Sequence, residues 1–226
     1  MLNSLFDNFS NIIVFDVETT GTDYRRDEII EIALLQAARG SSGFDVVEEY
    51  SSLVNLSPNR KLPAIITDLT GITEEQLLKE GAPKEKVCEK LTDVLVAQNL
   101  LLVAYNAQFD LCFLYSFLNR FGKNDALKNI KMLDVLTVYR DRRPYPHKLS
   151  DAVSMYSLDT NSSHRALDDA RVTYQLLCEM GKESDDLGRY INLFGYNPKY
   201  GVNGSKISSV KYLPQGYDRA KKLYET

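Results

Sequence analysis

The chain has 226 residues, of which 44% are hydrophobic and 26% are charged, and its formal net charge is −4. This composition excludes a disordered chain and predicts a globular protein with one large core. No apolar run reaches the roughly 18 residues of a membrane span, and the opening MLNSLFDNFSN lacks the basic start of a secretory signal. We therefore expect a cytoplasmic protein that has no membrane partner.

The apolar pattern of the sequence predicts five strands and several helices. In chain order we expect strands at 12–19, 28–38 and 44–56, a helix opening at Pro83, a strand at 101–106, a helix over 108–122, a strand near 131–138, and helices from about Leu149 and over 165–181. This order predicts an α/β fold in which helices flank a five-stranded mixed sheet.

The segment KESDDLG, residues 182–188, is charged and ends in glycine, which is typical of a domain boundary. It predicts a main domain over 1–182 and a small C-terminal extension over 183–226. From Gly188 onward the extension carries seven Lys or Arg, two acids and six of the 14 tyrosines. Three roles fit such a segment: completing the fold, holding a polyanion, or binding a partner protein.

Two acids follow the apolar run of the first strand, in the segment IIVFDVETTG. Asp16 and Glu18 project from one face, because residues i and i+2 of a strand point the same way. Burying like charges side by side costs several kcal/mol unless a positive group lies between them. The pair therefore raises the question of which positive group it binds.

Two further acids are expected to point inward. Asp169 interrupts the apolar stripe of the helix over 165–181, whereas its neighbour Asp168 lies off that stripe. Asp110 lies in the first turn of the helix over 108–122, which is apolar nearly all round. Neither position is explained by a solvated helix face.

Clustered carboxylate oxygens are typical of sites for hard divalent cations. The three cysteines do not compete for this role, because they are far apart and lack the spacing of metal ligands. The sequence therefore predicts Mg²⁺, with Mn²⁺ as a substitute. Two such ions about 4 Å apart stabilise the attacking and leaving oxygens of phosphodiester cleavage. The predicted ligands are Asp16, Glu18, Asp110 and Asp169.

The segments FDVETTG, YNAQFD and HRALDDA resemble the three motifs of the DEDDh 3′–5′ exonucleases, the family of the proofreading epsilon subunit of bacterial DNA polymerase III. The resemblance covers about residues 10–181. It implies an RNase H-like fold and a two-metal hydrolysis at the 3′ end of single-stranded DNA. It also implies metal-ligand roles for the four carboxylates and a general-base role for His164. The expected partner is the 3′ end of a single-stranded nucleic acid, and a DNA polymerase is a further possible partner.

The sequence contains only two histidines, and a neutral imidazole is a suitable general base near pH 7. His164 lies in the polar loop TNSSHR, just before the helix that carries Asp169. His147, in RPYPHKLSDA, is the alternative, for which we expect a surface or phosphate-contact role. The segment YRDRRPYPHK, residues 139–148, combines four positive charges with aromatics and fits either a phosphate-tracking segment or a solvated loop.

Four residues are expected to bind the substrate strand. The resemblance places the backbone of Thr19 and Thr20 at the terminal 3′-hydroxyl. Asn106 is expected to bond sugar or phosphate, and Phe109 either stacks on the terminal bases or belongs to the core. Family members often have His-Asn where this chain has Tyr105 and Asn106, a departure that concerns substrate contacts more than metal binding.

Two other functions remain open from the sequence. An exoribonuclease or oligonucleotide-trimming enzyme would use the same residues, because nothing in the sequence distinguishes acceptance from rejection of a 2′-hydroxyl. A catalytically silent nucleic-acid adaptor would be expected to lose a carboxylate or the histidine. All five residues are present here, which disfavours the adaptor.

Overall fold

The computed structural model describes residues 2–159, 163–216 and 221–226. The polar loop before His164 and the C-terminal extension are therefore described only in part. The strands are β1 (Asn11–Thr19), β2 (Ile29–Arg39), β3 (Phe44–Leu53), β4 (Leu100–Ala104), β5 (Lys131–Asp134), β6 (Leu193–Tyr196) and β7 (Lys211–Pro214). The α-helices are α1 (Asn3–Phe6), α2 (Ala64–Thr70), α3 (Glu74–Glu80), α4 (Lys84–Leu95), α5 (Ala107–Arg120), α6 (Val135–Arg142), α7 (Leu149–Met155) and α8 (Ala166–Glu183).

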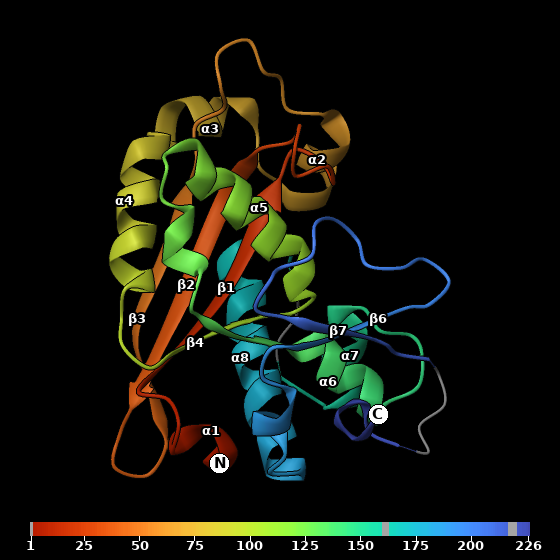
Figure 1. Cartoon of the computed structure of the whole chain (residues 1–226). Helices are drawn as coiled ribbons and strands as arrows, with labels where there is room; N and C mark the ends of the chain where they lie inside the picture. The colour runs from red at the N-terminus through yellow and green to blue at the C-terminus, as the bar shows by residue number, and fades with distance from the viewer. Residues whose placement is uncertain (1, 160–162, 217–220) are drawn as a thin grey trace.

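The first five strands form one mixed sheet in the order β3-β2-β1-β4-β5 (Figure 1). β1 to β3 pair antiparallel, as expected for strands joined by short turns, whereas β4 and β5 run parallel to β1. Parallel neighbours need crossover connections, which the helices between these strands supply. The expected α/β architecture with a five-stranded mixed sheet is confirmed.

Each face of the sheet buries its own hydrophobic core. Ile13 and Phe15 of β1 pack with the apolar stripes of α4 and α5, whereas Ile12 and Val14 point to the opposite face and pack with α8. The alternation along β1 assigns the later residues of the strand to the same two faces. Asp16 therefore shares the face that α8 covers. Of the helices in the described ranges, none is long and apolar enough to cross a membrane.

The structure corrects the expected fifth strand. β5 ends at Asp134, and the residues from Val135 to Arg142 form helix α6. The β-branched residues of this stretch favoured a strand, but the Asp134 side chain caps the helix by accepting from the amides of Leu136 and Thr137. Asp134 also accepts from the amide of Ala107 at 3.0 Å, so it fixes the start of α5 as well.

One other boundary differs from expectation, and two helices were not expected. Pro83 is the N-cap of α4, and the helix starts one residue later at Lys84. Helices α2 and α3 were not predicted at all. A signal for α3 was present in the sequence, because Thr73 and Gln76 have the spacing of a capping box and form one in the structure.

The described parts of the C-terminal extension pack on the main sheet. Asn192 pairs with Met132 of β5, donating its amide to the Met132 carbonyl at 2.7 Å and accepting the Met132 amide through its side chain at 2.8 Å. Tyr190 is fully buried and donates its hydroxyl to Asp141 of α6. The division into domains over 1–182 and 183–226 stays a prediction.

Replacing Tyr190 with alanine should destabilise the chain by about 3–5 kcal/mol, the usual cost of removing a buried aromatic side chain. Thermal and urea denaturation would measure this loss. Tyr200 belongs to the same extension but is 75% exposed, so Tyr200→Ala should leave the denaturation midpoint unchanged. Equal midpoints for the two variants would contradict a structural role for the packing of the extension.

Candidate active site

The carboxyl end of β1 is open on one side. β4 pairs with β1 only as far as Val14, so the later residues of β1 have no strand neighbour there. Asp110, in the first turn of α5, occupies this gap and accepts the amide hydrogen of Val17 at 3.2 Å. Its side chain is only 3% exposed. An inward-facing acid at the start of α5 is therefore confirmed.

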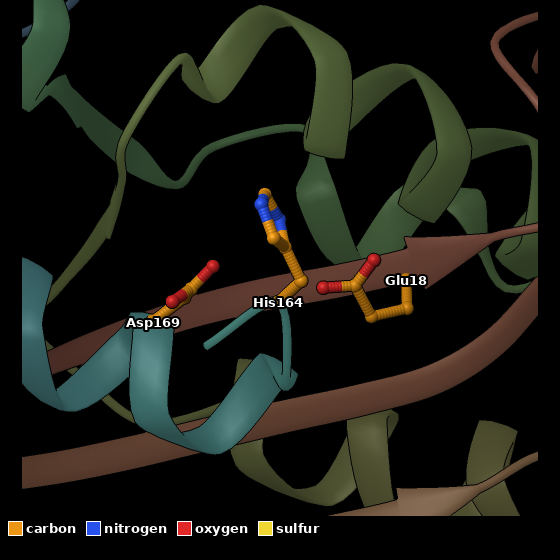
Figure 2. Close-up of side chains that lie close together, drawn as sticks. All are labelled: Glu18, His164 and Asp169. Atoms are coloured by element: carbon orange, nitrogen blue, oxygen red, sulfur yellow. The ribbon is translucent and has the colours of Figure 1, made fainter. Parts of the chain in front are cut away.

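The structure brings together three predicted residues from β1 and from the start of α8. One ligand atom each of Glu18, His164 and Asp169 lies within 4.8 Å of the other two. Figure 2 shows the imidazole between the two carboxylates, with the Glu18 carboxylate directed toward it. Asp169 is buried and accepts the amide hydrogen of Ser163 at 3.2 Å.

The four carboxylates form one electrostatic unit. Burial, and after it the negative charges of Asp110, Glu18 and Asp169, hold the pKa of Asp16 well above its usual range. Burial also raises the pKa of Asp110, although the hydrogen bond from Val17 opposes that shift. The pKa of Asp169 is raised by burial too. Without a cation, these groups therefore hold protons more tightly than in an unfolded chain.

A pH dependence of stability follows from Glu18. Burial and the charges of Asp169 and Glu31 raise its pKa from an ordinary value of 4.5 to about 8. Between these values the folded state binds more protons than the unfolded state, so the free energy of unfolding falls as the pH rises. We expect denaturation in EDTA to show this fall between about pH 4.5 and 8. Glu18→Gln should flatten it, and an equally steep fall in that variant would contradict the assignment.

The donor atoms fit a hard divalent cation. Carboxylate oxygens of Glu18 in β1 and Asp169 in α8 converge with the His164 imidazole, whereas the three cysteines are not part of this group. Burial, and after it the neighbouring negative charges, raise the pKa values of Asp16 and Glu18, and a divalent cation would offset both effects. Glu18 and Asp169 are close enough to share an ion, and Asp16 and Asp110 adjoin them.

The two histidines lie in different surroundings. His164 is exposed and adopts the left-handed backbone region, with φ of 51°, at the edge of the carboxylate group. His147 instead makes a 3.0 Å hydrogen bond between its Nε2 and the Arg143 carbonyl, and its ring packs edge-on against Tyr139 and Tyr145. The structure therefore brings only His164 to the carboxylates, as expected.

Thr19 is the last residue of β1, next to Glu18, and Thr20 follows it; both residues are buried. The Thr19 hydroxyl donates to the Gly21 carbonyl at 2.6 Å. The Thr20 hydroxyl donates to Asp27 and accepts from the Glu28 amide, so it holds the turn between β1 and β2. Substrate binding by these two residues stays a prediction, and it would rest on their backbone, since both hydroxyls are already hydrogen-bonded.

The other two predicted substrate residues lie at the start of α5. Asn106 is exposed, has φ of 64°, and its side chain makes no capping hydrogen bond to the helix. Phe109 is half-buried, with its ring centroid 4.9 Å from that of Phe113. Tyr105 donates its hydroxyl to the carbonyl of His147 at 2.9 Å. Both substrate roles stay predictions.

Glu31 is a residue of this site that we did not predict. It lies on β2 directly opposite Glu18, is 1% exposed, and pairs with the Arg165 guanidinium at 2.8 Å. It also accepts the amide hydrogen of Ala166 at 3.0 Å, so it anchors the start of α8 beside His164. The sequence feature that could have identified Glu31 is the presence of an acid inside the apolar run IIEIALL. Arg165 supplies positive charge that partly opposes the rise in the pKa of Glu18.

Comparison with known proteins places the chain in a family. A family model described as Exonuclease (RNase T) matches residues 13–177. The chain is 31% identical over 179 residues to the PolC-type DNA polymerase III of Caldanaerobacter subterraneus subsp. tengcongensis, covering 78% of this chain and 12% of that protein. It is 33% identical over 178 residues to the 3′-5′ exonuclease DinG of Bacillus subtilis, covering 76% of this chain and 18% of that protein.

Solved structures show the same fold. E. coli exonuclease I in complex with a dT13 oligonucleotide superposes with a TM-score of 0.67 at 18% identity, over 76% of this chain and 41% of that one. The zinc-bound exonuclease I–ssDNA complex gives a TM-score of 0.71 at 16% identity, over 80% and 42%. The RNase H-like fold is thereby confirmed. Because the family model spans more than half of the sequence, the chain belongs to the exonuclease family of RNase T, the DEDDh 3′–5′ exonucleases.

Proposed function

We propose that this chain removes nucleotides from the 3′ end of single-stranded DNA, with two Mg²⁺ ions held by Asp16, Glu18, Asp110 and Asp169. The observation that carries the proposal is the convergence of Glu18, His164 and Asp169 within 4.8 Å, beside the buried Asp110 and the half-buried Asp16. The relatives support the substrate: one is named a 3′-5′ exonuclease, and exonuclease I is described with single-stranded oligonucleotides. The chain spans only 12–18% of the length of these curated relatives.

The residues of the site have different roles in the reaction. Bound divalent ions would polarise the phosphate and activate water, and this is the chemistry that the carboxylates provide for. His164 lies on an exposed loop, where its imidazole takes the proton of the attacking water as general base. Asn106 and Phe109, at the start of α5, hold the terminal sugar and base against the site.

Incubation of the purified chain with 5′-labelled oligothymidylate and Mg²⁺ tests this function. We expect a ladder of products shortened from the 3′ end. EDTA should abolish this degradation, and added Mg²⁺ or Mn²⁺ should restore it. A matched oligouridylate decides between DNA and RNA: faster degradation of the RNA would favour the exoribonuclease instead. Failure to degrade either strand would contradict the proposal.

The expected polymerase partner and the expected cytoplasmic location stay predictions. The relatives named DNA polymerase III PolC-type favour a proofreading role beside a polymerase. Co-purification of the tagged chain with a polymerase, followed by comparison of mismatched and matched 3′ ends, would test that role. The cytoplasmic location expected from the sequence is likewise a prediction.

A further inference from the structure

A second cavity lies outside the carboxylate group. It has a volume of about 460 Å³, within the range of small-ligand pockets, and it joins two segments that are far apart in the sequence. Residues 140–148 line one side, and residues 197–216 of the C-terminal extension line the other. The family model ends at residue 177, so the extension half of this cavity lies outside the region that relatives define. We call it the basic-aromatic cavity.

The lining is positively charged. Arg140 and Lys148 face the cavity, and Lys199 lies beside it next to Tyr200. In the described ranges none of these three cations forms an ion pair with an acid. The neighbouring Arg142 and Arg143 differ, because both are paired with Glu183. The Arg142 side chain is only 3% exposed, so Arg142 is not free for the phosphate-tracking role that the sequence left open for this segment beside that of a solvated loop. Arg140 donates one hydrogen bond, to the Gly195 carbonyl at 3.3 Å, and no acid of the described ranges neutralises the charge of these cations.

Two large aromatic side chains are exposed at the same place. Tyr145 is 70% exposed and Tyr200 is 75% exposed, although aromatic residues normally bury most of their surface. Both line the cavity, one from each of its two segments. Exposed aromatic rings beside unpaired cations are the combination with which proteins bind single-stranded nucleic acid, by stacking on bases and holding phosphates.

A buried polar group lines the cavity as well. Gln215 is 8% exposed and its side-chain nitrogen donates to the Thr137 carbonyl and to Asp141. Its Oε1 has no hydrogen-bond partner within the described part of the chain, which is costly for a buried acceptor. A ligand that donates a hydrogen bond, as the amino or imino groups of bases do, would satisfy it.

The cavity is connected to the candidate active site through one side chain. Tyr105 immediately precedes Asn106, and its hydroxyl donates to the carbonyls of His147 and Lys148 at 2.9 and 3.2 Å. The segment that lines the cavity is thus hydrogen-bonded to the end of β4, next to the helix that carries Asp110. A strand whose 3′ end occupies the active site has a basic, aromatic surface beside it.

We propose that the basic-aromatic cavity binds a nucleotide of single-stranded DNA upstream of the 3′ end, with Tyr145 and Tyr200 stacking on bases and Lys148 and Arg140 holding phosphates. This proposal rests on the proposed exonuclease function for its choice of ligand. It gives the C-terminal extension a role in substrate binding in addition to its packing on β5. It also predicts that affinity depends on strand length.

Fluorescence anisotropy in EDTA tests binding separately from cleavage. The probe is a labelled 12-mer oligothymidylate, with a labelled dinucleotide as the short comparison. Tyr200→Ala should weaken binding of the 12-mer about 5- to 100-fold, the range of one lost base–aromatic stack, and should leave the dinucleotide unaffected. Lys148→Ala should reduce the slope of log K against log salt by about 0.7.

Two matched variants on other surfaces control for general effects. Tyr115→Ala removes an exposed tyrosine of α5 and Lys86→Ala an exposed lysine of α4, and both should bind the 12-mer like the unmodified chain. If Tyr200→Ala and Lys148→Ala bind no more weakly than these controls, the proposal is overturned. Cleavage of the 12-mer with Mg²⁺, measured on the same preparation, decides the exonuclease function independently of this result.

Discussion

Replacing Asp169 with asparagine should reduce the rate of cleavage by at least about 10³-fold, whereas the same replacement at Asp168 should leave it nearly unchanged. Loss of a metal ligand removes several kcal/mol of transition-state stabilisation. Asp169 is buried and lies within 4.8 Å of Glu18 and His164. Asp168 is half-exposed and pairs with Arg171 and Ser163 instead. Single-turnover cleavage of labelled oligothymidylate with saturating Mg²⁺ would measure both rates.

The fold should survive the change at Asp169. Asparagine retains an oxygen that can accept the amide hydrogen of Ser163, and it removes one charge from an acidic cluster. We therefore expect the metal-free variant to denature at the same temperature as the parent chain or at a higher one. A folded Asp169→Asn variant with near-normal turnover would refute the metal-ligand assignment.

Replacing His164 with asparagine should lower kcat by about 10²–10⁴-fold, the usual contribution of a general base. His164 has φ of 51°, and asparagine tolerates this left-handed region better than most residues, so backbone strain should not contribute. Binding of the oligonucleotide should persist, because the four carboxylates remain. Cleavage rates under single-turnover conditions, with anisotropy for affinity, would separate the two effects.

His147 provides the comparison for that experiment. Its ring is held by the Arg143 carbonyl and by aromatic neighbours, away from the Glu18–His164–Asp169 group. We expect His147→Ala to change the single-turnover rate at saturating DNA far less than His164→Asn does. If the larger loss occurred at His147, the general base would have been assigned to the wrong histidine.

Much of the fold followed from local pattern. The first three strands and helices α5, α7 and α8 were expected within a few residues, because apolar periodicity and helix-stop residues are properties of neighbouring positions. Two of the differences lie where a helix starts at a side-chain cap. Asp134 starts α6 in a stretch rich in β-branched residues, and the capping box at Thr73 starts a helix too short for a clear apolar stripe.

The sequence by itself identified Asp169 as unusual, because an Asp within an apolar stripe is anomalous without any knowledge of the fold, although the likewise buried Glu31 was missed. It also favoured His164 over His147 by position and motif. Neither conclusion required knowing how distant segments meet, since periodicity assigns a side chain to a face from local geometry alone.

Only the tertiary structure decided which groups from distant segments meet. Glu31 and Arg165 are separated by 134 positions, and their ion pair beside Glu18 exists because β2 lies next to β1 and the start of α8 returns to it. The basic-aromatic cavity likewise joins residues near 145 with residues near 200. Long-range contacts depend on how the whole chain packs, because the local sequence pattern of one segment does not specify which distant residues will contact it.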